Sequence, residues 1–284
     1  MIIIPTKFKI NIARSIYFII SRLRKILGKK NVGIFKRNEI NWNLTLSEGI
    51  DFSIFLRGSF EPEVIKAYKL NIKQNDTILD IGANIGAHTL PLANLVGNNG
   101  RIIAIEPTIY AYNKLLVNIQ LNPNLSKQIT SVHSYLAESN EDSIEGQISS
   151  RWPIVNEKLT NQTDHGGILE STMGAAVTTV DQLVKDHNIK NLNWVKLDVD
   201  GNELKILKGA KNTMDTFFPG IFMEIAPSCH KGNNYQQFYE LINLLESTGY
   251  TMTRIKDNKA LRLDPEVLIK TIPENASINV LLAK

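Results

Sequence analysis

The residues best placed to do chemistry lie in one short stretch, Asp76–Gly86, where an apolar run leads into a turn that contains glycines. A strand followed by such a turn and a helix brings backbone N–H groups close to a bound ligand, near the positive end of the helix. A dinucleotide fingerprint of the form GxGxxG would need glycine at positions 84 and 87, which are Asn84 and Ala87. The stretch therefore predicts a ligand-binding turn and argues against a nicotinamide site.

Two acidic residues, Asp80 and Glu106, make this prediction more specific. Asp80 stands two residues before Gly82, and the resulting DxGxNxG arrangement is the one that S-adenosylmethionine sites use. Asn84 stands where glycine is commoner, and asparagine tolerates the left-handed backbone that such a turn needs. Glu106 ends the next apolar run, where a carboxylate can accept both ribose hydroxyls of an adenosine. The alternative for Glu106 is an acid that caps the following helix.

These residues need a scaffold that brings strand ends together. From residue 76 onward, short apolar runs alternate with helical patterns, which is typical of a parallel, doubly wound sheet. We expect strands at 77–82, 101–106, 129–136, 193–199 and 220–225, with helices at 85–96, 109–121, 179–188, 203–216 and 234–248. Two closing strands follow at Tyr250–Ile255 and Ala276–Leu282, and residues 138–178 are interpreted as a loop insertion. The sequence thus predicts an α/β fold whose mostly parallel sheet ends in an antiparallel hairpin.

Two further segments precede this domain, which we place at residues 76–284. Residues 39–75 are interpreted as a lid segment, because Trp42, Leu44 and Leu46 alternate with polar residues as in a strand, and Gly58–Pro62 is typical of a turn into a helix. Residues 1–38 hold ten Lys/Arg and no acid, which leaves the rest of the chain with a net charge of −6. Because nucleic-acid enzymes usually carry basic charge on the folded body, no nucleic-acid partner is expected.

Within the basic segment, residues 7–30 predict an amphipathic helix. Its apolar residues recur at spacings of four and three along one face: Ile12, Ile16, Ile19, Leu23 and Ile26. One interpretation is a helix docked on the catalytic body or in a dimer seam. The other is a helix on an anionic membrane surface, which the Lys/Arg-rich composition favours. The oligomeric state is not predicted.

Together the motifs form a specific set. They are Leu79–Leu90, Glu106–Pro107, Thr179–Leu183, Val195–Ala210 and Phe222–Glu224, in this order. The set resembles the FkbM family of S-adenosylmethionine-dependent methyltransferases over roughly residues 50–225. One departure is Asp198–Gly201, where the family usually has DxEG and this chain has Asp200 in place of the longer Glu.

The resemblance implies a Rossmann-like class I methyltransferase that uses S-adenosylmethionine to methylate oxygen, typically a hydroxyl of a sugar or a natural product. The residues expected to bind the cofactor are Asp80, Gly82, Ala83, Asn84, Gly86, Glu106 and Asp198. The expected acceptor is a sugar, glycan or glycolipid. The alternatives are a small natural product as acceptor, a nicotinamide-dependent oxidoreductase, and a non-catalytic membrane-associated adaptor that retains the fold.

Catalytic groups are expected at the carboxyl ends of the central strands, where open α/β sheets bind ligands. Asp198 and Glu224 end neighbouring strands, and both are candidates for positioning the acceptor or removing its proton. Lys196 must be paired if it is buried in its strand, and we expect Glu224 as its partner. The alternative for Glu224 is therefore a purely structural ion pair.

Five histidines are candidates for the general base, and the sequence does not decide between them. His230 lies in a loop expected to overhang the site and is the preferred candidate, with His165 in the insertion second. His88, His133 and His187 are interpreted as structural. Asp198, Asp200 and Asn202 resemble the start of a calcium loop without the required glycine, so no metal is expected.

The remaining expectations concern the compartment. The apolar run Ile16–Ile20 is far shorter than the roughly 20 residues that span a bilayer, and no cleavage site of small residues follows it. Cys229 is the single cysteine, which excludes an internal disulfide. We expect a cytoplasmic protein, with peripheral placement on the inner membrane face if the N-terminal helix binds lipid.

Overall fold

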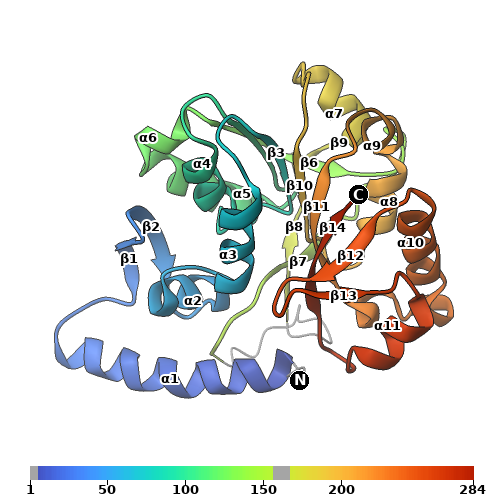
Figure 1. Cartoon of the computed structure of the whole chain (residues 1–284). Helices are drawn as coiled ribbons and strands as arrows, with labels where there is room; N and C mark the ends of the chain where they lie inside the picture. The colour runs from blue at the N-terminus through green and yellow to red at the C-terminus, as the bar shows by residue number, and fades with distance from the viewer. Residues whose placement is uncertain (1–5, 156–166) are drawn as a thin grey trace.

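The computed structural model describes residues 6–155 and 167–284, and an eight-stranded sheet forms the centre of the protein (Figure 1). The strands run in the order β13-β12-β14-β11-β10-β3-β4-β5. The parallel strands are β3 (Thr77–Ile81), β4 (Arg101–Ile105), β5 (Ile129–Val132), β10 (Trp194–Leu197) and β11 (Gly220–Ile225). The antiparallel strands are β12 (Thr251–Arg254), β13 (Lys259–Leu261) and β14 (Ile278–Ala283). The predicted Rossmann-like fold is confirmed, and β13 is an additional strand that the sequence analysis missed.

Helices cover both faces of this sheet (Figure 1). One face carries α3 (Pro62–Asn71), α4 (Thr89–Val96) and α5 (Ile109–Gln120). The other carries α7 (Val180–Asp186), α8 (Glu203–Lys208), α9 (Lys211–Phe217) and α10 (Gln236–Ser247). Side chains alternate across a strand, so Ile78 packs into the core under α3 and α4 whereas Leu79 packs into the core under α7 to α10. Two short helices, α6 (Pro123–Ser126) and α11 (Pro265–Thr271), complete the set.

Three of the predicted elements were wrong in their bounds. The helix predicted at 85–96 begins only at Thr89, because positive φ angles at Asn84 and Gly86 keep the preceding residues in a turn. The helix predicted at 203–216 is two helices, broken near Gly209, where a Cβ would lie 2.2 Å from the carbonyl oxygen of Ala137. The strand predicted at 129–136 divides at His133, after which β6 (Ser134–Leu136) pairs with β9 (Ala176–Thr178).

The insertion at 138–178 is more ordered than the predicted loop. It contains β7 (Gln147–Arg151) and β8 (Ile168–Ser171), which pair antiparallel. The polar composition concealed these strands, because both are only partly buried and lack an apolar alternation. His165, one of the two preferred histidines, lies outside the described residues.

The segment 39–75 packs into the main body. It contains β2 (Ile40–Thr45), α2 (Gly49–Arg57) and α3, which begins at Pro62 as predicted. Trp42 and Leu44 are buried in a core shared with Leu90 of α4 and Leu115 of α5. The segment therefore contributes to the same core, while its role as a lid stays a prediction. Its partner strand β1 (Val32–Arg37) was not predicted.

The predicted N-terminal helix is α1 (Thr6–Ile26), which lies along one end of the molecule beside α2 (Figure 1). It docks through Ala13, Ile16, Tyr17 and Ile20, and the Tyr17 ring packs edge-on against Phe52 at a centroid distance of 5.6 Å. Ile16 is the member of the predicted apolar stripe that takes part in docking. The other four members of the stripe are exposed: Ile12, Ile19, Leu23 and Ile26. Within the described ranges, no helix combines the length and apolarity needed to cross a bilayer.

Candidate active site

The turn after β3 has the shape that its sequence predicts. Gly82, Asn84 and Gly86 have φ angles of 76°, 49° and 89°, all in the left-handed region. At Gly82 a Cβ would lie 2.1 Å from the carbonyl oxygen of Asp198, so the end of β10 approaches the turn as closely as a glycine permits. The predicted left-handed asparagine at position 84 is confirmed.

The backbone donors of this turn are already in use. The N–H groups of Gly82 and Ala83 both donate to the carbonyl of Ile105, at 3.1 and 3.0 Å. Asn84 donates its N–H to Glu106 Oε2 at 2.9 Å. The turn therefore offers a ligand its shape, while charged contacts must come mainly from side chains around it.

Glu106 ends β4 beside this turn, as expected for a ribose-binding acid. Its Oε1 accepts hydrogen bonds from the N–H and the hydroxyl of Thr108, and burial raises the pKa of the carboxyl group against these bonds. Ser150 of β7 lies over it, bonded through its hydroxyl to Thr108 at 2.7 Å and through its carbonyl to the Asn84 amide at 2.9 Å. Strand β7 thus covers the predicted ribose site.

Lys196 and Asp80 form the buried charged centre of the sheet. Lys196 Nζ lies 3.6 Å from both Asp80 Oδ1 and Asp198 Oδ2 and donates to the carbonyl of Gly82 at 2.9 Å. The predicted pairing of Lys196 with Glu224 is wrong. The register explains this: Lys196 lies opposite Asp80 on β3, whereas Glu224 lies opposite a residue of β14.

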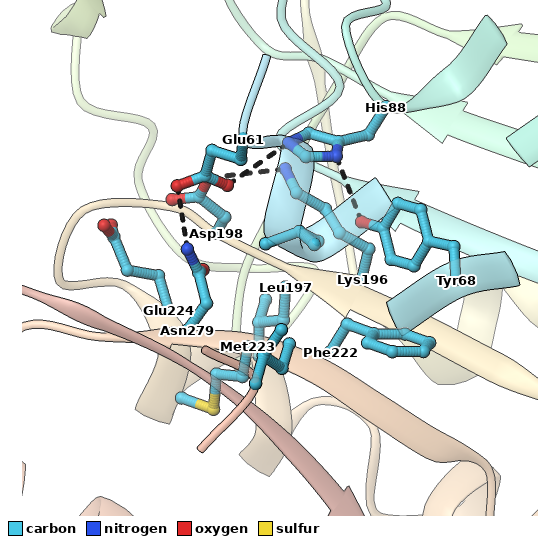
Figure 2. Close-up of a pocket in the computed structure, with 12 residues that line it drawn as sticks. Glu61, Tyr68, His88, Lys196, Leu197, Asp198, Phe222, Met223, Glu224 and Asn279 are labelled. Carbon is cyan, nitrogen blue, oxygen red and sulfur yellow. Dashed lines mark hydrogen bonds and ion pairs between the residues drawn. The ribbon is translucent and has the colours of Figure 1, made fainter. Parts of the chain in front are cut away.

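A small pocket lies beside this centre, near the carboxyl ends of β10 and β11 (Figure 2). Its polar lining is Glu61, Tyr68, His88, Lys196, Asp198, Glu224 and Asn279. The structure therefore brings Asp198 and Glu224 to one pocket, as the sequence predicted. It adds Glu61 and His88, which the sequence analysis did not single out as functional.

Three carboxylates converge at the edge of the pocket. Oxygen atoms of Asp198, Asp200 and Glu224 lie within 4.8 Å of one another. Desolvation and the Asp198 charge raise the pKa of Asp200 to about 8, although its side chain reaches the surface, and raise the pKa of Glu224 strongly. Such oxygens are what Mg²⁺ or Ca²⁺ prefers, so these residues could hold a cation. The expectation that no metal is used stays a prediction.

The unexpected feature of the pocket is a chain of three side chains (Figure 2). Tyr68 Oη lies 3.1 Å from His88 Nδ1, and His88 Nε2 lies 3.5 Å from Glu61 Oε2. Burial raises the pKa of Tyr68, so its hydroxyl stays protonated beside Nδ1. His88 thus links the buried Tyr68 hydroxyl to the Glu61 carboxylate.

Glu61 is held from its other side by Asn279, whose amide donates to Oε1 at 2.8 Å. Although burial opposes it, the bond from His88 keeps the pKa of Glu61 below its usual value. The backbone of Glu61 is left-handed, with φ of 43°, a strained conformation of the kind that gathers at functional sites. The sequence indicated a turn before Pro62, but no spacing in the sequence shows that Glu61 lies beside His88.

Among the described residues, His88 is the histidine that lines the pocket. His230 is buried, with Nε2 3.2 Å from Glu203 Oε2 and its ring beside Phe238. It does not line the pocket, so a catalytic role for His230 stays a prediction. His133 stacks on Tyr112 with its Nε2 3.1 Å from the carbonyl of Pro107, which agrees with a structural role.

The residues present fit S-adenosylmethionine: a left-handed turn at the end of β3, an acid at the end of β4, and a carboxylate-rich pocket where the reactive end would lie. The family model "Methyltransferase FkbM domain" matches residues 80–252.

Two curated proteins and one solved structure are among those similar to this chain. "Hexuronic acid methyltransferase AglP" of Haloferax volcanii is 29% identical over 57% of this chain, which spans 60% of that protein's length. "Probable cobalt-precorrin-6B C(15)-methyltransferase (decarboxylating)" of Saccharolobus solfataricus is 28% identical over 62% of this chain and 92% of its own. The structure of methyltransferase FkbM from Methylobacillus flagellatus is 17% identical, with a TM-score of 0.45 over 78% of this chain and 50% of its own.

Proposed function

This chain belongs to the FkbM family of S-adenosylmethionine-dependent methyltransferases, and on that premise we propose that it methylates a hydroxyl group of a sugar, glycan or glycolipid. The observation that carries the proposal is the matched family domain together with the similarity to a hexuronic acid methyltransferase. A sugar acceptor is compatible with a pocket lined by carboxylates and an amide, because these groups accept and donate hydrogen bonds to hydroxyls.

The methyl transfer requires the protein to align the two reactants and to receive one proton. The cofactor supplies an electrophilic methyl group on a sulfonium; a C–O bond forms, the C–S bond breaks, and the acceptor hydroxyl loses its proton. The protein must align the acceptor oxygen with the methyl carbon and receive that proton. In our proposal Asp198 and Glu224, which line the pocket, position the acceptor or receive its proton. His230 remains the histidine proposed as the general base.

Two parts of the site are proposed to bind the two ends of the cofactor. We propose that the segment Asp80–Gly86 holds the amino-acid end of the cofactor and that Glu106 accepts the ribose hydroxyls. Asp80 itself is fully buried, so it would act on the site through Lys196 and Thr89, whose hydroxyl donates to Asp80 Oδ2 at 2.6 Å. For the ribose to reach Glu106, β7 would have to move aside at Ser150.

The test is transfer of a labelled methyl group from S-adenosylmethionine to defined acceptors, namely uronic acid glycosides, glycolipids and polyprenyl-linked sugars. The proposal expects an O-methyl product from at least one of these, identified by the methyl chemical shift in NMR. Labelling of carbon, or labelling only of small non-sugar metabolites, would contradict it. Absence of both transfer and cofactor binding would favour the non-catalytic adaptor.

We also propose that α1 places the enzyme on an anionic membrane surface. After docking, α1 still exposes Phe18, Ile19, Leu23 and Ile26, with 55% to 77% of each accessible. Four exposed cations follow or flank this face without an ion pair in the described part of the chain: Arg22, Lys25, Lys29 and Lys30. An apolar stripe rimmed by unpaired cations is what a helix lying on anionic lipid presents, whereas two such helices facing each other would bring like charges together.

Sedimentation with vesicles tests this placement. The full chain should bind vesicles that contain phosphatidylglycerol and should be released by high salt, because the Debye length falls to about 3 Å at 1 M. Changing Leu23 and Ile26 to Ser should abolish binding, while the matched control Leu70→Ser, at an equally exposed site on α3, should leave it intact. Equal sedimentation of all variants, or dimerisation lost in the α1 variant, would refute the membrane proposal.

A further inference from the structure

Two carboxylates that line the pocket, Glu61 and Glu224, have no lysine or arginine within ion-pair distance among the described residues. Lys196 is the lysine of the pocket, and its Nζ lies 3.6 Å from both Asp80 Oδ1 and Asp198 Oδ2. Glu61 is therefore a carboxylate of the pocket that no lysine or arginine neutralises directly.

Two neighbours orient Glu61. The Asn279 amide donates to Oε1 at 2.8 Å, and His88 Nε2 lies 3.5 Å from Oε2. These two contacts fix both oxygens of a side chain that is still 23% exposed towards the pocket. A fixed, ionised and partly desolvated carboxylate is a strong site for a cationic ligand group.

The position of Glu61 identifies which cation it would meet. His88 immediately precedes the first residue of α4 and follows Gly86 by two residues, so Glu61 reaches the end of the turn that is expected to hold the amino-acid end of the cofactor. An ammonium group needs acceptors, which the N–H groups of that turn are not, and the carboxylate of Asp80 is fully buried. Glu61 is a carboxylate outside the turn that lines the pocket and can accept from this group.

We propose that Glu61 binds the α-ammonium group of S-adenosylmethionine, with His88 and Asn279 as positioning residues. Glu61 lies outside the part of the chain that matches the family domain, so the contact couples the lid segment to cofactor binding. The inference concerns the cofactor and holds whatever the acceptor is.

Calorimetric titration with two probes tests it. S-adenosylhomocysteine carries the ammonium group, and 5′-methylthioadenosine lacks the whole amino-acid end. Glu61→Gln should weaken binding of S-adenosylhomocysteine at least tenfold and change binding of methylthioadenosine less than twofold. Glu63→Gln, at an exposed acid in the first turn of α3 that does not line the pocket, is the matched control and should change neither by more than twofold. Glu61→Asp, which keeps the charge, should lose less affinity than Glu61→Gln.

Three results would overturn the proposal. If Glu61→Gln binds S-adenosylhomocysteine as tightly as the wild type, Glu61 does not contact the ammonium group. If methyl transfer is lost at the same time, Glu61 is instead a proton acceptor. Equal weakening of both probes makes its role structural. If Glu61→Gln does not fold, wild-type protein that binds S-adenosylhomocysteine no more tightly than its analogue without the α-amino group contradicts the proposal.

Discussion

Replacing Lys196 by Met should destabilise the protein strongly, because it removes the cation from a buried carboxylate. Lys196 is 5% exposed and Asp80 is fully buried. Asp80 Oδ1 has no hydrogen bond in the described structure, so its stabilisation comes from Lys196 Nζ at 3.6 Å. Breaking a buried ion pair by removing one partner costs about 3–5 kcal/mol. For a chain of this size that corresponds to a fall in Tm of roughly 10 °C.

The assay is urea unfolding followed by tryptophan fluorescence, with the double variant Asp80→Asn/Lys196→Met as the internal control. Because the substituted amide carries no charge, the double variant should recover about half or more of the loss. The sheet register predicts this coupling, since Lys196 and Asp80 lie opposite each other on β10 and β3. A single variant within about 0.5 kcal/mol of wild type, or additive losses in the cycle, would refute the reasoning, whatever the effect on catalysis.

Three further predictions concern the site. Glu106→Ala should weaken binding of S-adenosylhomocysteine by about 2–4 kcal/mol, since charge-assisted hydrogen bonds are lost; an unchanged dissociation constant in calorimetry would remove Glu106 from the ribose. Asp198→Asn should lower turnover much more than cofactor affinity, and equal losses would make Asp198 a cofactor ligand instead. The pKa of Asp200 is raised to about 8 in the folded state, so this carboxyl group destabilises the protein progressively as pH rises from about 4 to 8. The urea midpoint of Asp200→Asn should therefore fall less than that of the wild type between these two pH values. Equal falls in both proteins would contradict the raised pKa of Asp200.

The sequence predicted most of the sheet because four of its parallel strands, β3, β4, β10 and β11, are short apolar runs that both faces of the fold bury. It failed where tertiary contacts override local pattern. Gly209 ends a helix because the backbone at Ala137 approaches it, and β7 and β8 are polar strands that pair mainly with each other. The face of α1 that docks is set by Tyr17 meeting Phe52, a contact between segments whose separation in the chain hides it.

The residues of the candidate site also fall into those that local sequence indicates and those that tertiary contacts determine. Asp80 and Asn84 could be singled out because they belong to one local motif, and Glu106 because it follows the next apolar run. The partner of Lys196 could not, since strand order decides which carboxylate lies beside it. Glu61 was missed because its meeting with His88 depends on how α3 packs on the sheet, and no spacing in the sequence encodes that distance.

A structure determined with S-adenosylhomocysteine bound would locate the cofactor on the sheet. The ribose hydroxyls should lie within hydrogen-bonding distance of Glu106, β7 should have moved aside at Ser150, and the sulfur should face the pocket of Asp198 and Glu224. A ligand that binds away from the carboxyl ends of β3, β4 and β10, with Ser150 still covering Glu106, would contradict this placement.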